Sequence, residues 1–452
     1  MWTNWRADRY DTDLGRIASL GANTVRVVVQ SELFGYPEPS AIYLDRLRQM
    51  IELADRHGLH VQLTLFDWHS ADYADIAGSK TWARAVLGPY VGDPRIACVE
   101  LRNEIDTTDS AALAWARTMI PFLQTFLERR TPVTISVGGS DPLPRLGALK
   151  TALAVARPDF YSLHYFGGGG ETAYWTLLEA KRLVSPTPLW VGETGYPTTP
   201  AASGYADLAP TSSAQEAAQS HFLKTLQWAS WKVGLPRIGI WTFSDFLPGA
   251  IPGESIPEAE YHLGLYRTDG SAKPAAAVVS TLFSRTKPRL DFNNGFEQAV
   301  ADAAGHAFPA EWSGQVRAGG AIAQDKSVAH RGRASASLRS LDGRTTGGFF
   351  HITPIATAIP ARATAEASVW VRVRARRADV RLALDWLNAA GRYYRTREVR
   401  LSRPGSGWTK LVIKASRPAA GRSVRLFLKV ASSTGTVWFD DVRFSVRETK
   451  PS

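Results

Sequence analysis

Two glutamates, each at the end of an apolar run, are the residues best suited to chemistry. Glu104 follows Asn103 in "VELRNEIDTTD" (99–109), and Glu193 lies in "LWVGETG" (189–195). If both runs are strands of one parallel barrel, their carboxyl groups meet at the same end of it. One carboxyl group can then protonate a leaving oxygen while the other acts on the opposite side, which is what glycoside hydrolysis requires. Taken singly, either glutamate is better explained as an ordinary polar strand end.

Other side chains at the ends of apolar runs suit a sugar site. Asn103 could bind a sugar hydroxyl, Tyr165 could orient a nucleophilic carboxylate, and Arg26 could keep that carboxylate ionised. Mutual repulsion and partial burial are expected to hold one proton between the two glutamates near neutral pH. An aromatic floor for a sugar ring is expected from Trp241. The remaining candidates for substrate binding are Trp68, His69, His164 and Asp245.

These residues are distributed over β-rich runs that alternate with helical patterns. In residues 41–58, Leu44, Leu47 and Ile51 recur at helical spacing, and Gly58 follows as a stop. This alternation predicts an α/β fold, a (β/α)8 TIM barrel whose first strand is missing from the chain and is expected upstream of Met1. An open doubly wound sheet is the alternative, but "GGGG" at 167–170 lacks the lysine and the spacing of a nucleotide-binding loop. The strand candidates are 23–29, 60–66, 96–101, 132–137, 159–165, 188–192 and 238–243.

The sequence changes character near residue 287. Short alternating runs separated by Gly, Pro and Ser replace the helical period, as in "AEASVWVRVRA" and "TVWFDDVRFSV". This texture predicts an all-β jelly-roll sandwich. The expected domains are therefore a catalytic barrel over 1–286 and a β-sandwich over 287–452.

Charge and composition exclude several classes of protein. The net charge of +11 divides into −3 for residues 1–287 and +14 for residues 288–452, where arginines alternate with apolar residues as on a solvated strand face. We therefore expect no nucleic-acid partner. The single cysteine, Cys98, allows no intramolecular disulfide and no cysteine metal cluster. No apolar run reaches the length of a membrane span. The start "MWTNWRADRYDTD" lacks the apolar region of a signal peptide, and we expect the natural N-terminus to lie upstream of Met1. We expect a monomer.

Four motifs in order, "RNE", "HY", "GETG" and a tryptophan, resemble the strand ends of clan A retaining glycoside hydrolases, particularly the family 5 cellulases and mannanases. "NTVRV" (23–27) is similar to their second strand. The resemblance implies Glu104 as acid/base and Glu193 as nucleophile, with no catalytic cofactor. It implies a β-linked glucan or mannan as polysaccharide or oligosaccharide substrate, and an extracellular location. The sugar-binding positions that it implies are Arg26, Asn103, His164, Tyr165 and Trp241.

The C-terminal part resembles jelly-roll carbohydrate-binding modules of the family 4/9/22 type, through its "GFE" opening and terminal "DDV" strand. That resemblance implies a structural calcium held by Glu297, Asp440 and Asp441. Sugar stacking is expected from Trp386, Tyr393 and Tyr394, which lie in a predicted hairpin, although a purely structural cap remains an alternative. For the whole chain, the alternatives are a noncatalytic glycan-binding or adhesion protein on a degenerate barrel, and a transglycosylase.

Overall fold

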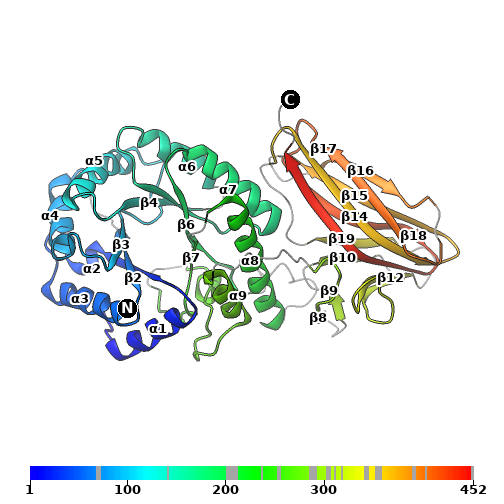
Figure 1. The fold of residues 1–452 in the computed structure, drawn as a ribbon, viewed down its shortest axis with the longest axis horizontal. Coiled ribbons are helices and arrows are strands. Elements are labelled where there is room, and N and C mark those ends of the chain that lie inside the picture. The colour runs from blue at the N-terminus through cyan, green and yellow to red at the C-terminus, as the bar shows by residue number, and fades with distance from the viewer. Residues whose placement is uncertain are drawn as a thin grey trace.

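The computed structural model consists of an α/β barrel followed by a β domain (Figure 1). No helix within the described parts of the chain is both long enough and apolar enough to cross a membrane. The structure describes residues 1–67, 73–139, 142–199, 212–235, 238–251, 256–284, 293–301, 307–309, 312–316, 319–340, 346–351, 359–388, 393–402 and 405–448.

The barrel sheet contains seven parallel strands in the described residues, hydrogen-bonded in chain order from β1 to β7. A doubly wound sheet reverses its strand order partway, so this sequential order identifies a barrel. The seven predicted strands are therefore confirmed, and β1 and β7 are the outer strands of a nearly closed barrel. Their bounds are β1 Thr24–Gln30, β2 His60–Asp67, β3 Ile96–Glu100, β4 Val133–Val137, β5 Phe160–His164, β6 Leu189–Thr194 and β7 Ile238–Ile240.

Helices surround this sheet and cover its outer face (Figure 1). The predicted helical period is correct in α3, where Leu47, Ile51 and Ala54 are buried against the sheet. Helix α5 begins after Asp109, whose carboxylate accepts the main-chain N–H groups of Ala111 and Ala112. The helices are α1 Ala7–Ser19, α2 Ser31–Phe34, α3 Ala41–Arg56, α4 Ile76–Leu87, α5 Ser110–Phe126, α6 Pro142–Ala152, α7 Gly170–Val184, α8 Ser212–Val233 and α9 Pro274–Phe283, with 3-10 turns η1 Gly88–Tyr90 and η2 Glu258–His262.

The β domain contains two five-stranded antiparallel sheets, ordered β10-β13-β18-β15-β16 and β11-β12-β19-β14-β17. Counted from β12, one sheet holds the first, eighth, third and sixth strands, and the other holds the second, seventh, fourth and fifth, which is the jelly-roll order. The described strands are β8 Ala299–Ala301, β9 Ala307–Pro309, β10 Trp312–Val316, β11 Gly320–Asp325, β12 Ser335–Ser340, β13 Gly347–His351, β14 Ala363–Arg374, β15 Ala378–Leu387, β16 Tyr393–Arg400, β17 Thr409–Ser416, β18 Ser423–Ser433 and β19 Thr436–Glu448.

The two parts of the chain share apolar and ionic contacts. Trp175 on α7 is buried as a member of the same apolar cluster as the sandwich core. On the same helix, Arg182 forms an ion pair of 2.7 Å with Glu448 at the end of β19. The predicted boundary between residues 286 and 287 falls within 285–292, outside the described residues.

Candidate active site

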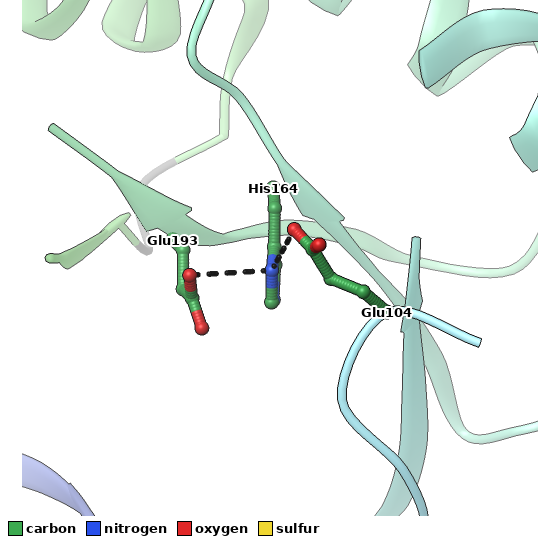
Figure 2. A group of neighbouring side chains, drawn as sticks. All are labelled: Glu104, His164 and Glu193. Carbon is green, nitrogen blue, oxygen red and sulfur yellow. Dashed lines mark hydrogen bonds and ion pairs between the residues drawn. The ribbon is translucent and has the colours of Figure 1, made fainter. Parts of the chain in front are cut away.

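Three predicted residues meet at the carboxyl ends of the barrel strands, with His164 lying between Glu104 and Glu193 (Figure 2). His164 is the last residue of β5, Glu193 lies in β6, and Glu104 follows β3. His164 Nδ1 is 2.9 Å from Glu104 Oε1 and 3.4 Å from Glu193 Oε2. Each of the three residues has one ring nitrogen or carboxylate oxygen that lies within 4.8 Å of the corresponding atom of the other two residues. The two glutamates therefore lie close together at one end of the barrel, as the sequence predicted.

Arg26 joins Glu193 to residues on the opposite side of the barrel. The guanidinium group forms an ion pair with Glu193, and it donates a 2.8 Å hydrogen bond to Asn103 Oδ1. Burial alone would lower the pKa of Arg26, but Glu100 and Glu193 outweigh it and raise that pKa above its usual range. A permanently charged cation is thus fixed beside one of the two site glutamates.

Glu100 belongs to this cluster, although the sequence interpretation did not include it. Its side chain is fully buried at the end of β3, and it forms a 2.7 Å ion pair with Arg26. Thr64 donates a 2.7 Å hydrogen bond to the same carboxylate, and Gln62 donates another of 3.2 Å. A carboxylate inside the apolar run "IACVEL" was the available signal, because a charge is rarely buried without a partner.

Two main-chain features position Glu104. Its φ is +41°, a left-handed conformation that is uncommon for a residue with a side chain. Its N–H group donates a 2.8 Å hydrogen bond to Ser136 Oγ on β4. The carboxylate lies against Gly138, where an added Cβ would be only 1.8 Å from Glu104 Oε1. Gly138, which the sequence analysis did not select, therefore provides the space for this side chain.

The charges around His164 differ from the expected sharing of a proton by two glutamates. The hydrogen bond from His164 holds the pKa of Glu104 below its usual range, although burial opposes this. Burial alone would lower the pKa of His164, but Glu193, Glu104 and Glu100 together raise it above its usual range. The arrangement thus favours a proton on His164, between two carboxylates, and a proton shared directly by the two glutamates stays a prediction.

Asp245 forms an internal ion pair, and its expected role in substrate binding stays a prediction. Its Oδ1 atom is 2.7 Å from Lys273 Nζ, with both side chains buried, and it also accepts the N–H group of Gly264. Lys273 in turn donates to Thr198 at 2.9 Å. Asp245 therefore joins the segments that follow β6 and β7 and lead into α9.

Tyr165 and Trp241 lie beside the site in different ways. The Tyr165 hydroxyl donates to the carbonyl oxygen of Gly168 at 2.5 Å, and only its main-chain N–H reaches the carbonyl oxygen of Glu193, at 2.8 Å. This geometry gives no support to the predicted orienting role of Tyr165. Trp241 directly follows β7 and is half-buried, and its main-chain N–H group donates to the Thr194 carbonyl oxygen. Trp68 and His69 lie outside the described residues.

The cluster of Glu104, His164 and Glu193 is suited in principle to two functions, metal binding and acid/base catalysis. Its three ligand atoms are close enough to hold an ion. However, Arg26 already supplies a positive charge to Glu193, and the raised pKa of His164 favours a proton on the nitrogen that a metal would need. The cluster therefore fits proton transfer better than metal binding.

The three carboxylates expected to bind calcium surround residues 330–333 of the β domain. Glu297 accepts the N–H group of Arg333 at 2.9 Å, and Asp440 accepts that of His330 at 2.7 Å. Asp441 bonds His330 Nδ1 at 2.5 Å, and burial raises the pKa of Asp440 to about 6. N–H donors occupy positions where a cation would need carbonyl oxygens, so the donor set does not fit calcium as it stands. Calcium binding remains a prediction.

Solved structures with a similar fold are glycoside hydrolases. A GH5_18 protein from Bifidobacterium longum subsp. longum matches at 18% identity, with 64% of this chain and 77% of that chain covered and a TM-score of 0.50. A glutamate-to-alanine variant of GH5_18 from the same subspecies, in complex with Manβ1-4GlcNAc, matches at 17% identity with 64% and 76% covered and a TM-score of 0.51.

An exo-β-1,4-mannosidase from Opitutaceae bacterium strain TAV5 matches at 20% identity and a TM-score of 0.49, over 63% of this chain. The chain spans only 56% of that mannosidase. No protein-family model and no curated protein matches the sequence. At these identities the likeness defines the fold: an α/β barrel similar to that of family 5 glycoside hydrolases, as the strand-end motifs predicted.

Proposed function

We propose that this protein is a retaining O-glycosyl hydrolase that cleaves β-linked glycans. The observation that carries the proposal is the pair Glu104 and Glu193, which face each other across His164 at the carboxyl end of the barrel. Oxygen atoms of the two carboxylates lie within 4.8 Å of each other. A separation near 5 Å suits direct attack on the sugar, whereas inverting enzymes leave room for a water molecule between carboxyl groups about 6.5–9.5 Å apart.

The surroundings of each glutamate support its proposed role. Glu193 is largely buried and forms an ion pair with Arg26, which places a positive charge beside the carboxylate proposed as nucleophile. The side chain of Glu104 is 37% exposed, so a leaving group can reach it. His164 Nδ1 lies 2.9 Å from its Oε1 atom and can supply it with a proton. Glu104 is therefore assigned as acid/base.

The reaction then proceeds by two displacements. Glu193 attacks the anomeric carbon while the proton held between His164 Nδ1 and Glu104 Oε1 passes through Glu104 to the glycosidic oxygen, so that the C–O bond breaks and an alcohol leaves. Ionised Glu104 next takes a proton from water and returns it to His164, while the water oxygen attacks the same carbon and releases Glu193. Two inversions give net retention. Asn103, held by Arg26, is placed beside Glu104, where an amide can bind a sugar hydroxyl.

The proposed substrate is a glucan or mannan type of glycan, outside the cell as the family resemblance implies. The names of two fold neighbours refer to β-1,4-mannoside and Manβ1-4GlcNAc, which makes mannosides the first compounds to test. We expect no cofactor in the reaction. A transglycosylase would use the same first step, with a sugar hydroxyl in place of water in the second.

The test is hydrolysis of 4-nitrophenyl β-mannoside and β-glucoside, then sugar release from mannan, cellulose, β-1,3-glucan and glycosaminoglycans. Wild type and Glu193→Ala are compared. We expect activity on at least one β-linked substrate and a loss of about 10⁴-fold or more in Glu193→Ala. Wild-type inactivity with retained polysaccharide binding would instead identify a noncatalytic glycan-binding protein. Transfer products that exceed hydrolysis products would identify a transglycosylase.

A further inference from the structure

We propose that Glu100 is a positioning residue for this site: a buried counter-ion that fixes Arg26 and keeps the proton of His164 on the hydrogen bond to Glu104. The inference rests on the proposed function and deepens it. Glu100 does not touch the space between Glu104 and Glu193 where a sugar would bind. It acts through the two cationic side chains that do contact these glutamates.

The contacts of Glu100 show why its position matters. Arg26 approaches its Oε2 atom through Nη2 at 2.7 Å and Nε at 2.8 Å. The hydroxyl of Thr64, between the two, donates to the same oxygen at 2.7 Å and accepts from Arg26 Nε at 2.7 Å. This network fixes the guanidinium plane. The Nη1 atom of Arg26 is thereby directed to Glu193 and its Nη2 atom to Asn103.

The second oxygen of Glu100 faces His164. Its Oε1 atom is 3.9 Å from His164 Nε2, and both side chains are fully buried. This separation is too long for a hydrogen bond, so the interaction between the two atoms is electrostatic. A negative charge at this distance in a buried site stabilises protonated imidazole substantially. Because Nδ1 faces Glu104 and Glu193, the stabilised proton lies where acid catalysis needs it.

Several charges act on His164 or on the glutamates that it contacts, and Glu100 is the fully buried carboxylate among them. Without the negative charge of Glu100, less would compensate the repulsion between Arg26 and protonated His164. The His164 pKa would then fall. The titratable and charged groups facing this cluster are Arg26 on β1, Asp67 on β2, Glu100 on β3, Glu104 after β3, Arg145 on α6, Glu193 on β6 and Glu260 on η2.

Two substitutions separate charge from geometry. Glu100→Gln keeps the shape and removes the charge, whereas Glu100→Asp keeps the charge and shortens the side chain. For Glu100→Gln we expect kcat to fall about 10- to 100-fold with little change in KM, because the negative charge that keeps a proton on His164 beside Glu104 is lost while the sugar contacts remain. The basic limb of the pH profile should move to lower pH. For Glu100→Asp we expect a lower kcat with the basic limb near its wild-type position.

The matched control is Glu216→Gln. Glu216 is also a buried carboxylate paired with an arginine, with Oε2 2.7 Å from Arg267, but it lies on α8 and contacts none of the site residues. This variant should lose thermal stability like Glu100→Gln while keeping the wild-type pH profile. A pH shift that appears in both variants would overturn the specific role of Glu100, as would wild-type kcat in Glu100→Gln.

His164 can also be observed without turnover. In protein with ¹³C-labelled histidine, one of nine imidazole signals is assigned to His164 by its absence in His164→Asn. We expect this signal to titrate at lower pH in Glu100→Gln than in wild type, and an unchanged titration contradicts the proposal. Because this measurement needs no substrate, it decides the role of Glu100 even if every glycan assay is negative. If Glu100→Gln does not fold, Glu100→Asp decides: a lower kcat with a His164 titration near that of wild type supports the proposal, and a wild-type kcat contradicts it.

Discussion

At the scale of single residues, the space beside Glu104 is the sharpest constraint on the site. A Cβ atom at position 138 would overlap the Glu104 carboxylate, because only 1.8 Å separates it from Oε1. We expect Gly138→Ala to reduce kcat by about 100-fold or more, since small displacements of a reacting group are costly. The control is Gly147→Ala on α6, where the added methyl group meets only Leu183 at 3.7 Å. Full activity of Gly138→Ala in a steady-state assay would show that Glu104 is not placed as described.

The assignment of Glu104 as the acid predicts a dependence on the leaving group. Glu104→Ala should lose about 10²- to 10⁴-fold in kcat on a glycan, where the leaving oxygen must be protonated. A 2,4-dinitrophenyl glycoside needs no such proton, so its first step should be nearly unaffected. Added azide should then accelerate turnover and give a glycosyl azide that retains the β configuration, identified by NMR. Equal losses on both substrates would contradict the acid/base role.

The charges on His164 make a prediction about stability and pH. Its pKa is raised in the folded protein by Glu193, Glu104 and Glu100, against the effect of burial. A raised pKa means that protonated His164 stabilises the fold most below the unfolded value of about 6.5, and that this contribution is lost as pH rises through the folded pKa. We expect the Tm difference between wild type and His164→Asn to be largest near pH 5.5 and to shrink by pH 9. A difference that is constant with pH would rule out a charged His164.

At the scale of elements, the strand ends explain how much of the site could be predicted from sequence. A parallel barrel places the ends of its strands together, so recognition of the strands carrying Glu104, His164 and Glu193 was enough to predict their meeting. Glu100 was missed because strand prediction treats the interior of a barrel as apolar. The ion pair of Asp245 with Lys273 could not be predicted, because only the three-dimensional structure brings these two residues together. Tyr165 follows its strand as expected, but its hydroxyl donates a hydrogen bond to a carbonyl group of the following loop.

The helix after the Glu104 segment gives a prediction at this scale. Asp109 caps α5 by accepting the N–H groups of Ala111 at 2.8 Å and Ala112 at 3.3 Å. We expect Asp109→Ala to lower stability by about 1 kcal/mol, because two N-terminal N–H groups lose their acceptor. Thermal unfolding should show this loss, with Thr118→Ala on the same helix as a control close to wild type. An unchanged Tm for Asp109→Ala would contradict the capping role.

At the scale of the whole molecule, part of the glycan-binding site predicted for the β domain remains a proposal. Trp386 is in the sandwich core, so its expected part in sugar stacking was wrong. Tyr393 and Tyr394 on β16 are 65% and 45% exposed, which suits rings that contact a ligand. We expect replacement of both by alanine to weaken binding to insoluble polysaccharide about tenfold, without changing turnover of an aryl glycoside. Unchanged binding in a pull-down assay would leave the β domain as a structural cap.

The burial of Trp175 bears on how the protein can be divided. This indole lies on a helix of the barrel, yet the side chains that shield it from water belong largely to the cluster of the sandwich. A shortened version that ends with α9 would present a bare aromatic patch on α7 to the solvent, beside an Arg182 that has lost Glu448. Exposed patches of this kind promote self-association. If the barrel is expressed by itself, Trp175 should therefore be replaced with a polar residue before its folding is judged.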